Sequence, residues 1–146
     1  MAVEIVNRSG GGKVSCRRLK KKAERILDLL KRSQVELSIA LIGNPEIQEL
    51  NAKYRKKNEP TDVLSFSSGE PLLPDLEILG DVVISVEQAE KQARKKKHKL
   101  DRELETLLIH GILHLLGYDH ERSQADAKIM RGMEKKLQRA LCEEGS

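Results

Sequence analysis

The segment from His110 to His120 constrains the fold of this chain more than any other stretch, because it holds three of the four histidines within eleven residues. Its sequence is H-G-I-L-H-L-L-G-Y-D-H. In an α-helix, a spacing of four residues gives about 400° of rotation, so His110 and His114 lie roughly 40° apart on one face. Gly117 can take the left-handed conformation that ends a helix sharply. The chain can then turn back and bring His120 to the same side.

Three imidazole ligands predict a catalytic metal site, since structural zinc sites are normally closed by four protein ligands. We expect one Zn²⁺ on His110, His114 and His120, although nickel or another divalent ion would accept the same ligands. The spacing H-x-x-x-H-x-x-G-x-x-H matches the metzincin proteases, which carry a glutamate directly after the first histidine as general base. Gly111 stands at that position here, which argues against a peptidase.

The pattern of apolar residues predicts an α+β protein. Alternating apolar residues predict strands over residues 2–7, 35–41, 62–66 and 81–86, and apolar residues at helical spacing predict helices over 15–30, 44–57, 86–97, 101–117 and 123–142. Two prolines and a glycine make 67–79 a loop. The order indicates one domain over residues 1–146, with a small mixed sheet of about four strands, about five helices and a zincin-like helix that bears the histidines.

Polar residues mark the expected starts of four helices. Ser15 and Asp101 are candidate N-caps, and Asn44 is a third, followed by a proline at the first helical position. Ser123 with Asp126 resembles a capping box. The helix that bears the histidines is therefore expected to begin at Asp101 and to end at the turn formed by Gly117.

Basic residues are clustered although the net charge is only +4. The clusters at 17–22, 55–57 and 94–99 can follow a phosphate backbone, and solvated helix faces are the alternative for any one of them. His98 lies inside the third cluster and is expected to be solvated. With only two tyrosines and one phenylalanine, base stacking is a weak contributor, so backbone charge would carry most of the affinity for a nucleic acid. The candidates for RNA-backbone contacts are Lys56, Lys57, Arg94, Lys95, Lys96 and Lys97.

The chain is expected to be cytoplasmic. Cys16 and Cys142 form no C-x-x-C pair and read as reduced thiols. The first residues lack the apolar core of a signal peptide. The longest apolar stretch, from Leu107 to Leu116, is far shorter than the roughly 20 residues that a membrane span needs, so we expect no membrane partner.

Three blocks of sequence resemble one known family. The histidine segment resembles the signature of the YbeY endoribonuclease family of bacterial rRNA maturation factors. Leu50-Asn51, Tyr54-Arg55 and the run from Pro60 to Phe66 are similar to the family's second block, and the run from Leu79 to Ile84 to its third. The blocks cover residues 50 to 120 in the family's order, and the remainder matches only in general layout.

The resemblance implies a small α+β domain with the histidines at a cleft. It also implies metal-dependent cleavage of single-stranded RNA, in the maturation of the 16S rRNA 3′ end and in ribosome quality control. The family's metal ligands carry over to His110, His114 and His120, and its functional arginine carries over to Arg55. The small ribosomal subunit and assembly factors are the partners that the resemblance implies.

The chemistry of phosphodiester cleavage suggests further roles. Arg55 is one catalytic candidate, because the paired donors of a guanidinium match the oxygens of the transition state. His114 is the other, as a ligand of the expected metal ion. The base stays open: metal-bound hydroxide or the ribose 2′-OH would attack. Asp119 would orient a ligand imidazole or cap the turn. The remaining candidates near the site are the carboxylates of Asp62 and Asp81 and the hydroxyls of Thr61 and Ser65. For the two hydroxyls, closing the turn at the strand is the favoured role.

Two other functions stay open. One is a metal-dependent hydrolase of another substrate, including peptide. The other is a non-catalytic ribosome-assembly factor whose metal only stabilises the fold, which the count of three ligands argues against.

Overall fold

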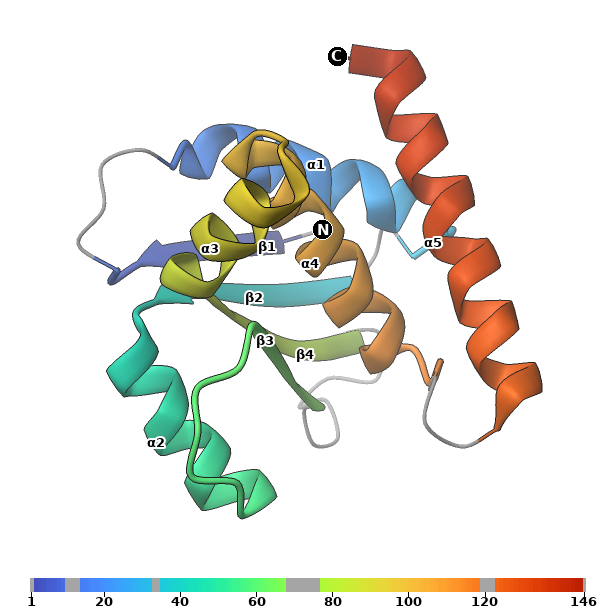
Figure 1. Ribbon diagram of the computed structural model, residues 1–146. Helices are drawn as coiled ribbons and strands as arrows, with labels where there is room; N and C mark the ends of the chain where they lie inside the picture. The colour runs from blue at the N-terminus through green and yellow to red at the C-terminus, as the bar shows by residue number, and fades with distance from the viewer. Residues whose placement is uncertain (1, 10–13, 33–34, 68–76, 119–122, 146) are drawn as a thin grey trace.

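The computed structural model describes residues 2–9, 14–32, 35–67, 77–118 and 123–145 (Figure 1). The strands and helices of these residues agree with the expected α+β order. The strands are β1 (Ala2–Asn7), β2 (Val35–Ile42), β3 (Val63–Ser67) and β4 (Glu77–Ser85). The helices are α1 (Cys16–Leu29), α2 (Asn44–Arg55), α3 (Val86–Lys96), α4 (Leu100–Leu115) and α5 (Gln124–Gly145).

The strands form one mixed sheet in the order β1-β2-β4-β3. β1 and β4 each pair with β2 in parallel, whereas β3 pairs with β4 antiparallel. β3 is therefore an edge strand. Its register places Ser65 opposite Val82 and Phe66 opposite Asp81, which decides which side chains face which helix.

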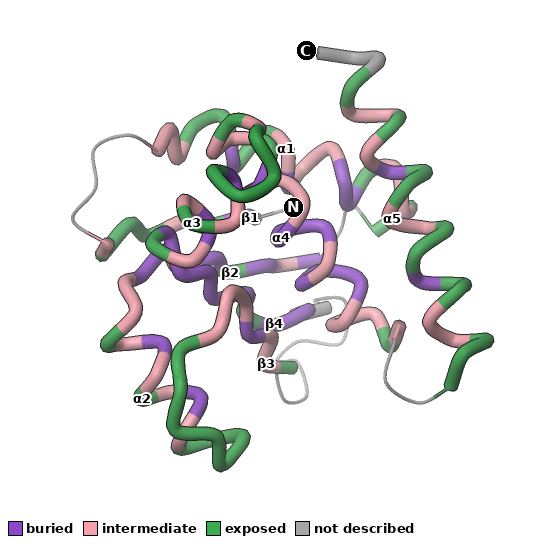
Figure 2. The backbone as a smooth tube through the Cα atoms, in the orientation of Figure 1, coloured by how far each residue is buried: buried purple, intermediate pink, exposed green. Residues whose placement is uncertain are grey.

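Helices cover both faces of the sheet. Successive strand residues point to opposite faces. Val82 and Ile84 of β4 belong to the main core, formed with α1, α3, α4 and α5, whereas Val83 belongs to a smaller core with Ile47 of α2. Figure 2 shows the buried residues in purple, concentrated along β2, β4 and α4 and interrupted there by half-buried and exposed positions. The histidine helix α4 and the basic helix α2 thus lie on opposite faces, with β3 between them at the sheet edge (Figure 1).

Two of the predicted helix starts are confirmed. The Ser15 side chain accepts a hydrogen bond from the backbone N–H of Arg18. The Ser123 hydroxyl accepts one from the backbone N–H of Asp126 at 3.0 Å. Both contacts satisfy backbone donors of the first helical turn, which have no partner within the helix.

Two other starts were predicted wrongly. α2 is capped by Gly43, and the Asn44 side chain instead accepts a hydrogen bond from the Ser85 hydroxyl at 2.7 Å. α4 begins at Leu100 after Lys99, so Asp101 lies within the first turn. In both cases a local cap was expected at a residue whose side chain contacts another part of the fold: Asp101 lies 3.5 Å from the Arg18 guanidinium.

The fourth strand is longer than predicted. It begins at Glu77, inside the stretch that was expected to be a loop up to residue 79. Pairing with β2 extends it, since Ile78 lies opposite Glu36 and Gly80 opposite Leu37.

Across the ranges that the structure describes, no helix combines the length and the apolar character needed to cross a lipid bilayer.

Candidate metal-binding site

The last turns of α4 bring two predicted ligands together. The ring centroids of His110 and His114 are 5.1 Å apart, with 56° between the ring planes. Two imidazoles that bind one tetrahedral ion through bonds of about 2.0–2.1 Å have centroids about 5 Å apart, so this pair fits a shared metal ion. α4 ends at Leu115, and Gly117 follows with a φ of 101°. The predicted left-handed glycine turn is therefore present.

The third predicted ligand cannot be placed. His120 and Asp119 lie outside the described residues. Among residues that the structure does describe, no three histidine, cysteine or carboxylate side chains gather into a metal-binding group. The assignment of His120 therefore stays a prediction, as does the role of Asp119.

Glu134, which the sequence analysis did not single out, contacts the ring of His110. Glu134 of α5 places its Oε2 3.4 Å from Nδ1 of His110. Metal-binding histidines usually donate this second ring N–H to a carboxylate or carbonyl, which fixes the ring and leaves Nε2 for the ion. A signal was available, because Glu134 lies at helical spacing between Met130 and Leu137, which are both buried. An acid on a buried stripe needs a partner.

Gly111 explains why the metzincin glutamate has no counterpart. A Cβ atom at Gly111 would lie 2.7 Å from Cγ1 of Val82 and 3.3 Å from the Ser65 hydroxyl. The position therefore faces the sheet at very close approach, and a glutamate there would collide with β4. The residue after the first histidine cannot supply a base in this packing, whatever its chemistry.

Thr61 and Asp62, just before β3, and Ser65, within it, make contacts inside the fold. Ser65 donates to the carbonyl of Gly111 at 3.0 Å, which ties β3 to α4. Asp62 accepts from the N–H of Val63 at 2.8 Å and from Gln92 at 3.2 Å, and Thr61 lies 3.4 Å from the same carboxylate. Thr61 and Asp62 thus contact each other in the turn before β3, whereas Ser65 joins β3 to α4 instead of closing that turn.

Asp81 is placed on the wrong face for a role beside the histidines. Val82, its neighbour on β4, faces Gly111 of α4, so Asp81 points to the opposite face, towards the α2 side of the sheet. Asp81 is exposed. The sequence suggested proximity because this segment belongs to a block that resembles the family, but the period of two along a strand decides the face.

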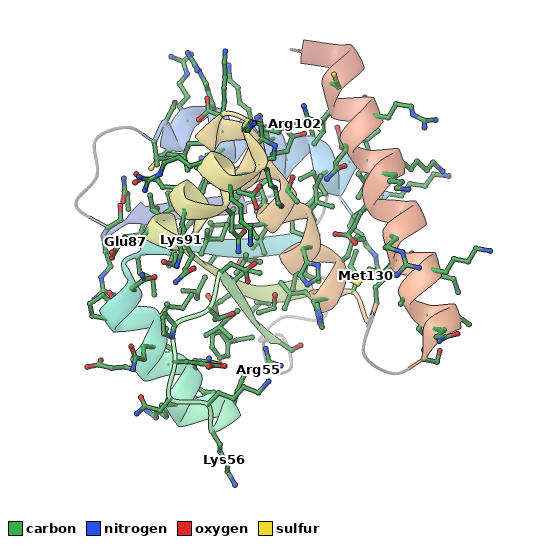
Figure 3. All side chains as sticks on the ribbon, viewed as in Figure 1. Arg55, Lys56, Glu87, Lys91, Arg102 and Met130 are labelled. Carbon is green, nitrogen blue, oxygen red and sulfur yellow. The ribbon has the colours of Figure 1, made fainter. Side chains whose placement is uncertain are left out.

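Arg55 is the last residue of α2. Next to it, the Tyr54 ring packs edge-on against Phe66 of β3 with centroids 5.1 Å apart. Since Ser65 of β3 contacts α4, β3 separates Arg55 from the histidine helix by one strand. Figure 3 shows Arg55 at the end of α2, with Lys56 directed away from the body of the molecule.

The turn after α2 is built by one buried amide. Asn51 is 2% exposed, and its side-chain nitrogen donates to the carbonyl of Glu59 at 2.9 Å. The backbone carbonyl of Asn51 accepts from the backbone N–H groups of Lys56 and Lys57, with Lys56 at a φ of 59°. These bonds fix the chain that follows Arg55. Tyr54 is 57% exposed, so the basic end of α2 carries an aromatic surface that composition did not predict.

The expectation for His98 was wrong. Its Nε2 lies 2.7 Å from Oε1 of Glu103, a side chain with no exposed surface, and His98 itself is only 20% exposed. The Lys96 ammonium group lies 3.1 Å from the other oxygen of the same carboxylate. A buried carboxylate needs such partners, so Lys96 serves the fold although it is exposed like Lys95 and Lys97. The lysines around His98 in the sequence suggested a solvated segment, so the contact between His98 and Glu103 was not predicted.

A mixed four-stranded sheet with a histidine pair on a helix packed against it defines a small α+β protein of the zincin-like type. The chain belongs to the YbeY family: the family model described as endoribonuclease YbeY matches residues 4–141. The chain is similar to the endoribonuclease YbeY of Aquifex aeolicus, at 48% identity over 133 residues that cover 88% of each chain. It is 39% identical to that of Syntrophotalea carbinolica over 145 residues, 97% of each chain.

A solved structure confirms the fold. The solution structure of TM1509 from Thermotoga maritima matches with a TM-score of 0.65 and 33% identity, over 93% of this chain and 86% of that one. The family match supports endoribonuclease activity for the chain.

Proposed function

We propose that residues 1–146 form one zinc-dependent, single-strand-specific endoribonuclease domain that acts in the cytoplasm on the precursor of 16S rRNA. The proposal extends to maturation of the rRNA 3′ end and to ribosome quality control, with the small subunit and assembly factors as partners. The observation that carries it is the His110–His114 pair at 5.1 Å, in a chain of the YbeY family.

The proposed ligands are His110, His114 and His120. When bound there, a zinc ion supplies a Lewis acid for a phosphoryl oxygen and lowers the pKa of bound water to about 7. Glu134 supports this assignment, because its contact with Nδ1 of His110 leaves Nε2 as the nitrogen that would bind the ion. Gly111 lets the helix approach β4 closely enough for this arrangement.

Arg55 is proposed to stabilise the charge that develops on the phosphorus oxygens. Its paired guanidinium donors fit two such oxygens. Asn51 and its hydrogen bonds to the following turn hold the end of α2, and Tyr54 packed on Phe66 holds the helix against β3. Lys56 and Lys57 then extend positive charge along the RNA backbone, together with the exposed Lys95 and Lys97.

The attacking oxygen is that of a water molecule or of the ribose 2′-OH. Because position 111 faces the sheet, the base does not come from the residue after His110. Asp62 is held by Val63 and Gln92, so it is assigned to the β3 turn rather than to proton transfer.

An RNA cleavage assay tests the proposal. End-labelled single-stranded RNA is incubated with metal-loaded protein, with chelated protein and with His114→Ala, and metal content is measured for each. The matched control is His98→Ala, which removes a histidine that contacts Glu103 instead of the proposed ion. We expect one metal ion and cleavage in the wild type and in His98→Ala, and neither in His114→Ala.

Other outcomes assign other functions. Equal cleavage in every lane would refute metal dependence. Peptide cleavage with intact RNA would assign a hydrolase of another substrate. If His114→Ala lost its metal and melted at a lower temperature but still cleaved RNA, the metal would be structural.

A further inference from the structure

A second basic surface lies at the other end of α4. α1, the start of α4 and the end of α5 enclose a groove of about 960 Å³. Its lining includes Leu141, Thr106 and Gln138, and the Gln138 amide donates to the Thr106 hydroxyl at 3.4 Å. The groove is lined by six basic and two acidic side chains, which are Arg18, Lys21, Lys22, Arg25, Lys99 and Arg102, with Asp101 and Glu105.

The charge of this groove is large for so small a chain. Six basic and two acidic side chains leave an excess of four positive charges, which equals the formal net charge of all 146 residues. The rest of the chain is therefore balanced, and the excess is concentrated at one surface. Such a concentration attracts a polyanion.

Part of this charge is held by the fold and part is available. Arg18 pairs with Asp101 at 3.5 Å and Lys22 with Glu105 at 3.2 Å, and both pairs connect α1 to α4. Lys21, Lys99 and Arg102 are exposed, and among the described residues no ion pair is formed by any of these three. Lys21 comes from α1, Arg102 from the first turn of α4 and Lys99 from the residue before α4, and all three line one groove.

The groove is connected to the histidine site by a stripe along α4. Arg102, Thr106, His110 and His114 follow one another at intervals of four residues, each turned about 40° from the one before, so the row winds about 120° around the helix. Arg102 lies near the start of α4 (Figure 3). At about 1.5 Å per residue it is about 18 Å from His114 along the helix axis. A single RNA strand of several nucleotides spans that distance.

We infer that this groove binds the phosphate backbone of single-stranded RNA, through Lys21, Lys99 and Arg102, with Arg102 about 18 Å from His114 along the axis of α4. The choice of RNA as the ligand rests on the proposed function. Ammonium and guanidinium groups on flexible stems suit successive phosphates without reading sequence. The groove would therefore add affinity for long substrates and leave the chemistry at the histidines unchanged.

The test uses chelated protein and a single-stranded oligouridylate of about 20 nucleotides, longer than most single-strand binding sites. The variant Lys21→Gln/Lys99→Gln/Arg102→Gln is compared with Lys128→Gln/Arg131→Gln/Lys135→Gln. The control removes the same number of lysines and arginines, at exposed positions of α5 outside the groove. Affinity is measured by fluorescence anisotropy over a series of salt concentrations.

The expected changes follow from counterion release. Loss of three phosphate contacts reduces the slope of log K against log salt by about 2, and weakens binding by up to about 100-fold at 0.1 M salt. The control variant should change both quantities much less. Cys142 is exposed and lines the groove, so bound RNA should also slow its alkylation by a maleimide.

The remaining outcomes overturn the inference. Unchanged affinity and slope in the groove variant would refute it, as would an equal loss in the control. Protection of Cys142 by polyglutamate but not by RNA would assign the groove to an acidic protein segment instead. Failure of the proposed function is seen separately: wild-type protein that binds RNA through the groove but never cleaves it refutes the nuclease and leaves the groove site standing.

Discussion

The substitution Gly111→Ala tests how closely α4 must approach the sheet. The added Cβ would lie 2.7 Å and 3.2 Å from the two methyl groups of Val82 and 3.3 Å from the Ser65 hydroxyl. Val82 is fully buried in the middle of β4. A β-branched side chain in a strand has little freedom to move aside, so the helix itself must shift.

Two opposing effects set the magnitude. Replacing a glycine inside a helix by alanine stabilises it by about 1 kcal/mol. Overpacking a well-filled core costs about 1–3 kcal/mol. We expect a net loss of about 0–2 kcal/mol in the free energy of unfolding, and a displaced His110–His114 pair with weaker metal binding.

Gly132 provides the matched control. It also lies inside a helix, α5, but a Cβ there would meet no atom within 4 Å. Gly132→Ala should therefore stabilise the protein by about 1 kcal/mol, or raise Tm by about 3 °C for a chain of this length. Urea denaturation and calorimetry of the two variants measure the difference, expected to be about 1–3 kcal/mol.

A double variant makes the reasoning stricter. Val82→Ala removes the two methyl groups that the new Cβ would contact. Combined with Gly111→Ala, it should cost less than the sum of the two single changes, because the overlap is relieved. If Gly111→Ala stabilises the protein as much as Gly132→Ala does, the close approach is not required and this account is refuted.

Three further predictions concern other contacts. Glu134→Gln should weaken metal binding about 10- to 100-fold with the fold intact, measured by competition with a chelating dye; unchanged affinity would remove Glu134 from the site. His98→Ala should lower the unfolding free energy more than Lys96→Ala, by about 1–3 against less than 1 kcal/mol, because the exposed lysine is screened; thermal melts that rank them in reverse would contradict this. Asn51→Ala should raise hydrogen exchange in the turn after α2 and slow RNA cleavage through a displaced Arg55.

The sequence determined the order of the elements and the proximity of two of the predicted ligands. The spacing of apolar residues within each segment predicted whether it forms a strand or a helix, because that spacing is a local property of the sequence. The pair His110 and His114 is fixed by the helical repeat, so its proximity was predictable. Gly117 was predictable for the same reason, because a sharp helix end needs a residue that tolerates positive φ.

Contacts between distant segments were decided by tertiary structure. Glu134 and His110 are 24 residues apart, and no local pattern pairs them. Asp81 was a candidate near the site, but it lies on the face of β4 opposite to that of Val82, which faces α4. His98 looked solvated until the packing of α3 against α4 buried Glu103 beside it. In each case the deciding quantity was which surfaces meet, and that depends on the packing of the whole chain rather than on neighbours in sequence.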